Sequence, residues 1–165
     1  MSLCTRALAL AAVLAPSLAA AQFNLVPPPL CRTPAPSTST TVEAYRVEAS
    51  RHLYDCFPGR VYPDALPPLV LGIITIEAEI DDKGRVLSVV VVRKPAAEEI
   101  EPWILAVLRR AAPFPDPVNL PGGAVRLVET FFVDRSGLFQ TLSLTEAQKG
   151  LPPIEVSTPL STKPP

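Results

Sequence analysis

The sequence predicts an α+β domain in which two helices cover one face of an antiparallel sheet of three or four strands. Two observations indicate this class. Segments with apolar residues at every third or fourth position alternate with segments in which apolar residues recur at every second position or form short runs. Each of the two strand pairs is joined by a short turn that contains Asp and Gly, which is typical of antiparallel hairpins. The predicted order of elements is therefore α-β-β-α-β-β.

The first predicted helix covers residues 42–57. Thr40 and Glu43 have the spacing of a capping box, in which a hydroxyl and a carboxylate satisfy free backbone N–H groups. The Phe-Pro-Gly sequence at residues 57–59 ends the helix. We expect His52, on this helix, to be exposed to solvent. One face of the helix carries apolar residues at helical spacing, namely Val42, Tyr45, Ala49, Leu53 and Cys56.

The first two strands are predicted at residues 69–80 and 86–93. The first strand alternates between apolar and polar side chains, so one face of the sheet should be in contact with water. The second strand is an almost continuous run of valine. The turn between the two strands is Asp-Asp-Lys-Gly, and Gly84 suits a positive φ. The apolar face of the first strand carries Ile74, Ile76, Ala78 and Ile80, and its polar face carries Thr75, Glu77 and Glu79.

The second predicted helix covers residues 97–112, and its apolar stripe should lie on the dry face of the sheet. Trp103 and Phe114 are expected to lie in the core between helix and sheet, with a hot spot for a partner as the alternative. A third strand follows at residues 124–133 and a fourth at residues 138–144. The stripe of the helix consists of Ile100, Ile104, Val107, Leu108 and Ala111.

Residues 1–21 have the layout of a secretory signal peptide, with one arginine before an apolar run that ends in three alanines. We expect cleavage after Ala21. Retention as a membrane anchor is the alternative, although the run is short for a spanning helix. Residues 22–39 form a Pro/Ser/Thr-rich arm and residues 150–165 a Pro-rich tail, and both are expected to be extended or disordered. The folded domain is assigned to residues 40–149.

Two cysteines remain when Cys4 is removed with the signal peptide. Cys31 and Cys56 form an even pair in an exported chain, in which disulfides persist. A bond between them would tie the Pro-rich arm to the end of the first helix. Two free thiols are the alternative.

Composition and motif content argue against several classes of function. The chain has 15 basic and 16 acidic residues, so its formal charge of −1 offers no broad attraction for nucleic acid. A single histidine excludes a multi-histidine metal site, and the sequence contains no Gly-rich phosphate loop or Cys-x-x-Cys motif. Glu77 and Glu79 resemble an acid–base pair, but glutamates on the water-facing side of a strand are ordinary. We therefore predict no catalytic residue, cofactor, metal or small-molecule substrate.

An ordered series of residues resembles a known family. The series consists of Tyr62-Pro63, Gly72, the hairpin IDDKGRV at residues 80–86, a helix that ends in LRRAAPFPDP, and the strand VRLVETFFV. This combination behind a signal peptide is similar to the C-terminal domain of TonB and of the related TolA, and the added leading helix is more like TolA. The resemblance implies a protein-binding module of the envelope without catalytic residues.

In that family the domain binds by adding a strand of its partner to the edge of its sheet. The resemblance implies that the receiving strand is Val125–Val133 and that the partner is an envelope protein, such as a segment of an outer-membrane receptor or transporter. The predicted strand 138–144 would cover this edge, so a ligand would have to displace it or use the edge of strand 86–92. The implied partner-binding residues are Tyr62, Pro63, Val125, Arg126, Leu127, Val128 and Phe131.

TonB and TolA themselves carry an uncleaved anchor that couples to a proton-driven motor. Here the anchor is predicted to be cleaved, and a freed domain cannot transmit force from the inner membrane. We therefore predict a stand-alone periplasmic adaptor. The alternative is an inner-membrane-anchored energy transducer for outer-membrane transport, which requires residues 7–21 to be retained.

Overall fold

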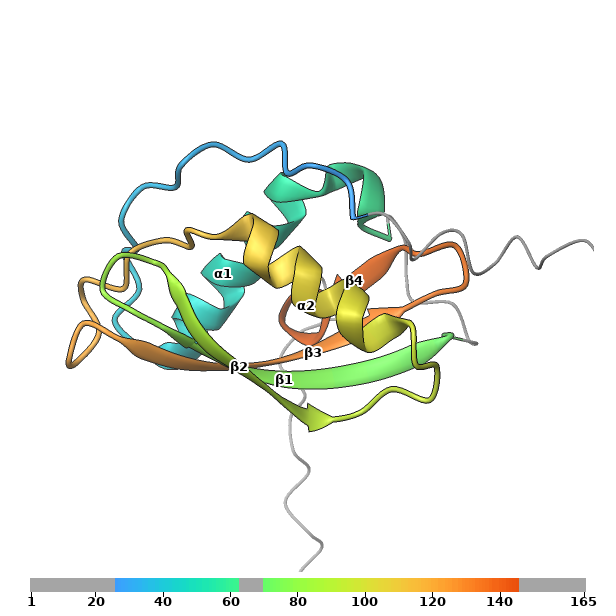
Figure 1. Cartoon of the computed structure of the whole chain (residues 1–165). Helices are drawn as coiled ribbons and strands as arrows, with labels where there is room; N and C mark the ends of the chain where they lie inside the picture. The colour runs from blue at the N-terminus through green and yellow to red at the C-terminus, as the bar shows by residue number, and fades with distance from the viewer. Residues whose placement is uncertain (1–25, 63–69, 146–165) are drawn as a thin grey trace, which may run out of the picture.

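A computed structural model describes residues 26–62 and 70–145 of the chain (Figure 1). It confirms the predicted α+β class, because two α-helices accompany a four-stranded antiparallel sheet. The predicted signal peptide, Pro63 and the Pro-rich tail lie outside the described residues. In chain order the elements are α1 (Val42–Cys56), the 3-10 helix η2 (Pro58–Arg60), β1 (Gly72–Ile80), β2 (Val86–Arg93), α2 (Ile100–Ala111), β3 (Val125–Val133), β4 (Phe139–Thr141) and the 3-10 helix η3 (Leu142–Leu144).

The sheet has the strand order β2-β1-β3-β4, and both α-helices lie on one of its faces (Figure 1). The core fills the space between the sheet and the helices. Trp103 and Phe114 are both buried there, as predicted. The largest side chains with almost no exposed surface are Trp103, Tyr45, Phe57, Phe114, Phe131, Phe139, Leu53, Ile74, Ile76, Ile80, Ile100 and Ile104.

α1 begins at Val42, as predicted, but its N-cap lies one residue later than the capping box predicts. Thr41 has extended backbone angles, and its hydroxyl accepts a hydrogen bond of 3.2 Å from the Ala44 N–H. Thr41, rather than Thr40, is therefore the N-cap, and Glu43 is one position short of the capping-box spacing. Val42 consequently lies in the first turn, where its side chain is 42% exposed.

β2 pairs with β1 through two irregular positions. The register skips Leu87 between the pairs Glu79–Ser88 and Ile80–Val86, and it skips Val92 between Thr75–Arg93 and Ile76–Val91. Such bulges change the face to which a strand directs its following side chains. As a result, the outer face of β1 is polar as predicted, but β2 exposes three large apolar side chains, Leu87, Val90 and Val92.

The fourth strand is shorter than predicted. β4 covers Phe139–Thr141 only, and the chain continues as η3 instead of extending the strand to residue 144. Where the strand stops, two backbone N–H groups form hydrogen bonds with side chains instead of with a neighbouring strand. The Thr141 N–H donates to the Tyr54 hydroxyl at 3.0 Å, and the Thr130 N–H donates to the Glu129 carboxylate at 2.8 Å. The ladder between β3 and β4 therefore ends early.

The arm from Val26 to Ser39 is extended, as predicted, but it packs against the helices and is part of the folded domain (blue in Figure 1). The Arg110 guanidinium of α2 donates to the Val26 carbonyl. The Leu30 N–H donates to the Cys56 carbonyl at 2.8 Å. The Ser37 N–H donates to the Asp116 carbonyl at 2.9 Å, and the Ser37 side chain is buried. Within the described residues, the folded part thus begins at Val26 instead of Thr40.

Candidate functional site

The open part of the β3 edge is the candidate functional site. β4 pairs with β3 only through Phe131–Thr141, Phe132–Gln140 and Val133–Phe139. On the same side, residues 125–130 of β3 have no strand partner within the described parts of the chain. The strand that the family resemblance implies is therefore only partly covered.

The register shows which backbone groups point to this open side. The Asp134 N–H donates to the Leu138 carbonyl, so every second residue back along β3 also directs its N–H and C=O groups toward β4. In the open part these residues are Thr130, Val128 and Arg126. The Glu129 carboxylate already binds the Thr130 N–H. In this open part, Arg126 and Val128 are therefore the residues whose N–H and C=O groups are both available to a further strand.

Three of the predicted partner-binding residues on β3 do not reach this surface. Val125, Leu127 and Phe131 are at most 4% exposed, and their side chains lie in the core. Their backbone groups face β1, which pairs with β3 in an unbroken register. Arg126 and Val128, by contrast, have exposed side chains. The structure thus divides the predicted set by the alternation of the strand.

Tyr62 lies at a different part of the sheet. Its N–H donates to the Phe139 carbonyl at 3.0 Å, and its own carbonyl accepts from Gln140 Nε2 at 3.0 Å. Val61 forms a parallel bridge with Phe139. The Val61–Tyr62 segment therefore borders the outer side of β4, and the structure does not bring Tyr62 to the open part of β3.

A shallow cavity of about 190 Å³ lies beside the open edge. The exposed side chains of Arg126 and Val128 form one wall, and the first turns of α1 form the other. Sequence reasoning did not find the α1 side, because it assigned Val42 to the buried face of the helix and assigned no role to Arg46. The residues that line this cavity are Val42, Glu43, Arg46, Arg126 and Val128.

The charges of the cavity favour an anion over a cation, since two arginines face one glutamate. Arg46 Nε is buried and has no hydrogen-bond partner among the described residues. Arg126 Nε is 3.3 Å from Glu77 Oε1 on the outer face of the sheet. Arg126 is therefore partly neutralised, whereas no described residue forms an ion pair with Arg46 or accepts a hydrogen bond from its Nε.

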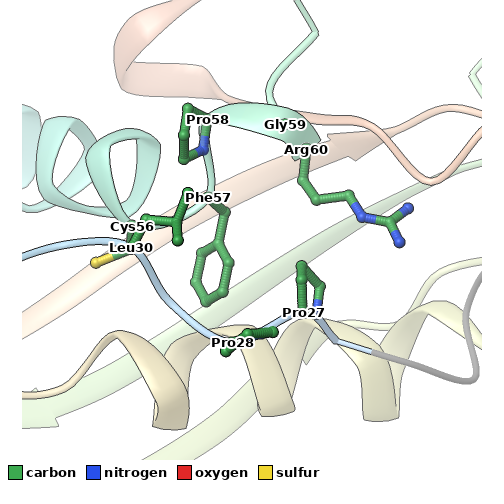
Figure 2. Close-up of a pocket in the computed structure, with 8 residues that line it drawn as sticks. All are labelled: Pro27, Pro28, Leu30, Cys56, Phe57, Pro58, Gly59 and Arg60. Carbon is green, nitrogen blue, oxygen red and sulfur yellow. The ribbon is translucent and has the colours of Figure 1, made fainter.

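Another cavity, of about 270 Å³, lies between the arm and the end of α1. Figure 2 shows the Phe57 ring directed toward Pro27 and Pro28 of the arm. Among the described residues that line it, Arg60 is the one with a charged side chain. This lining lacks the several converging polar groups that are typical of a catalytic or small-ligand site.

The histidine and the two cysteines of the arm and α1 lie together, with His52 and Cys56 buried and Cys31 half-buried. Cys31 and Cys56 are joined by a disulfide with an S–S distance of 2.08 Å, which agrees with the predicted pairing. His52 is buried, so the expectation that it is exposed was wrong. Its Nε2 is 2.8 Å from the Ala111 carbonyl and its ring meets Phe114 edge-on, because this part of α1 faces the end of α2. These three residues link the arm to the two helices.

Comparisons with protein-family models, with curated proteins and with solved structures find no match for this chain. Among residues 26–62 and 70–145, no helix has the length and apolar character needed to cross a membrane.

Proposed function

We propose that this domain is a non-catalytic protein-interaction module that binds an extended segment of an envelope protein as an added strand on the open part of β3. One observation carries the proposal. β4 stops at Thr141, opposite Phe131, and leaves Arg126 and Val128 with outward backbone groups beside a cavity. Strand addition is a recurring mode of peptide recognition, in which the backbone provides affinity and alternate side chains provide specificity.

The size of the open edge sets the expected affinity. Arg126 and Val128 each offer one N–H and one C=O, and a net hydrogen bond is worth about 1 kcal/mol, so backbone pairing contributes about 4 kcal/mol. Association costs at least about 4 kcal/mol in lost translational and rotational freedom. Side-chain contacts in the cavity must therefore supply most of the measurable affinity.

The envelope location is part of the same proposal. The Cys31–Cys56 disulfide supports an oxidising compartment, where such bonds persist. The resemblance to the TonB C-terminal domain supports a partner such as a segment of an outer-membrane receptor or transporter. The periplasm is therefore the proposed site of action, with cleavage of the signal peptide after Ala21.

Proline substitution tests which edge is used. Val128→Pro removes an outward N–H at the open edge, and edge strands tolerate proline in such positions. The matched control is Val89→Pro on the other exposed edge. Val90 pairs with Glu77 of β1, so the neighbouring Val89, which lies between the two bulges of β2, directs its N–H away from β1. Eight-residue peptides selected from a random library on the full exported chain would serve as probes. We expect the dissociation constant of Val128→Pro to rise at least about fivefold, which corresponds to the loss of one hydrogen bond of about 1 kcal/mol, and that of Val89→Pro to stay unchanged.

Circular dichroism and thermal unfolding would establish that both variants fold. The proposal is contradicted if a folded Val128→Pro variant binds as tightly as the wild type. It is also contradicted if Val89→Pro is the variant that loses binding, or if the wild type selects no peptide.

A further inference from the structure

The cavity at the open edge is built from two elements that a bound strand would touch together. Val42 and Arg46 are four positions apart in α1 and therefore lie on one side of that helix. Arg126 and Val128 project from the outer face of β3. Because successive side chains of a strand point to opposite faces, an added strand would direct one set of side chains at α1 and the other set toward Val128.

Arg46 gives the α1 side of the cavity a defined chemical preference. Its buried Nε has no hydrogen-bond partner in the described residues, and an unsatisfied buried donor costs about 1–3 kcal/mol. A guanidinium matches a carboxylate with charge-assisted hydrogen bonds. A carboxylate that enters the cavity would bring its negative charge to the Arg46 guanidinium, because Arg46 lines the cavity.

The cavity also has exposed apolar side chains on both of its walls. Val128 is 41% exposed, and Val42 across the cavity is similarly exposed. Glu43 adds one negative charge to the lining, and Arg126 shares its charge with Glu77. A basic side chain would meet the Arg46 guanidinium and be repelled.

Resting on the function proposed above, we infer that the open part of β3 selects extended segments in which an acidic residue alternates with apolar residues. The acidic side chain is directed at Arg46, and its apolar sequence neighbours lie on the outer face beside Val128. The acidic residue therefore determines which segments are bound, because its charge is complementary to that of Arg46 in the cavity lining.

A second copy of this chain fits the same edge less well. Pairing of two β3 edges about a two-fold axis would bring the arginine-bearing cavities of both copies to one interface. Like charges at such an interface oppose association. The charge of the site thus favours a different chain with acidic character.

Three peptides test the inference directly. Each is a fluorescein-labelled octapeptide of alternating valine and threonine, in which one central threonine is replaced by Glu, Gln or Lys. We expect the full exported chain to bind the Glu peptide at least about tenfold more tightly than the Gln peptide, and the Lys peptide more weakly still. Fluorescence anisotropy would give the dissociation constants.

Arg46→Gln is the decisive variant, and Arg109→Gln, near the end of α2, is its matched control. In Arg46→Gln the preference for Glu over Gln should fall to within about twofold, whereas Arg109→Gln should keep it. Thermal unfolding would check that both variants fold.

The outcomes separate this inference from the proposed function. If wild type binds the Glu and Gln peptides equally and Val128→Pro abolishes both, the edge binds strands but the acidic preference is refuted. If the preference survives in Arg46→Gln, another group recognises the acid and the inference is wrong. Failure of all three peptides to bind overturns both. A dimer in analytical ultracentrifugation that Val128→Pro dissociates would assign the edge to a second copy.

Discussion

β2 and the open part of β3 lie on opposite sides of the sheet, and the two strands differ in how regularly they pair with β1. β2 is a complete edge strand of eight residues, but its pairing with β1 is interrupted at Leu87 and at Val92. β3 pairs with β1 in an unbroken register, and only part of its other side is open. Bulges twist an edge strand and interrupt its ladder, and natural proteins use them to discourage unwanted pairing.

If β3 is the docking edge, as we propose, exposed apolar area alone does not identify such an edge. Leu87, Val90 and Val92 make β2 the more apolar edge, with each side chain 57–60% exposed. The open part of β3 exposes Val128 but combines it with outward backbone groups in regular register and with a free arginine donor. A regular ladder with a neighbouring cavity distinguishes β3 from β2.

The largest expected difference between the two strands is in stability. Phe131 on β3 has no exposed surface, so Phe131→Ala should lower the free energy of unfolding by about 3–5 kcal/mol through lost contacts and a cavity. Val90→Ala on β2 removes an exposed side chain and should change it by less than about 0.5 kcal/mol. Urea denaturation measures both values. Equal losses would show that β2 is packed as tightly as β3 and would remove the basis of the comparison.

A smaller difference is expected between two glutamates. The buried Glu129 carboxylate accepts hydrogen bonds from Ser50 Oγ at 2.9 Å, from Ser143 Oγ and from the Thr130 N–H. Glu129→Gln weakens these charge-assisted bonds and should cost about 1–3 kcal/mol of unfolding free energy. Hydrogen exchange should also become faster at the Thr130 amide, at the point where the β3–β4 ladder ends.

The matched control is Glu77→Gln on the outer face of β1. Its ion pair with Arg126 is partly solvated, so its loss should cost no more than about 1 kcal/mol. A Glu129→Gln variant as stable as this control, with an unchanged Thr130 exchange rate, would refute the assigned role of Glu129 in ending the ladder.

The sequence predicted the elements with clear periodicity. The alternation of Ile74, Ile76, Ala78 and Ile80 predicts both the strand and its buried face, and all four side chains are buried. The bulges of β2 could not be predicted, because a run of valines has no period that a skipped residue would disturb. Glu129 occupies a core-facing position of β3. A polar residue at such a position does not indicate from the sequence alone that its carboxylate binds the Thr130 N–H and that β4 ends there.

The cavity and the folded arm depend on contacts that are remote in the sequence. Arg46 interrupts no helical pattern, and only the position of α1 over the sheet edge brings it near Val128. The arm has a composition typical of disorder, yet Arg110 binds the Val26 carbonyl from 84 positions away. Composition and periodicity report local preferences, so they do not reveal anchors of this kind.

The smallest expected effect concerns acid stability at the turn that joins β1 to β2. Asp81 accepts hydrogen bonds from the backbone N–H groups of Lys83 and Arg85 and from Arg85 Nε, at 2.7–2.9 Å. Desolvation opposes the charged form, but these bonds and the Arg85 charge together lower the pKa of Asp81 below its ordinary value of 3.8. Because the folded pKa is the lower one, the stabilisation is complete above the unfolded pKa and is lost as pH falls through the folded pKa.

The free energies of unfolding of the wild type and of Asp81→Asn should therefore differ at neutral pH and converge as the pH falls below 3.8 and through the lowered pKa of folded Asp81. Urea denaturation at a series of pH values measures this gap, with the neighbouring exposed Asp82→Asn as the control. A gap that persists unchanged in acid would mean that the protonated Asp81 side chain holds the turn as well as the carboxylate does. In that case the β1–β2 hairpin, and with it the bulged edge, would owe its acid resistance to the backbone of the turn and to Gly84, whose carbonyl accepts from the Phe114 N–H at 2.8 Å.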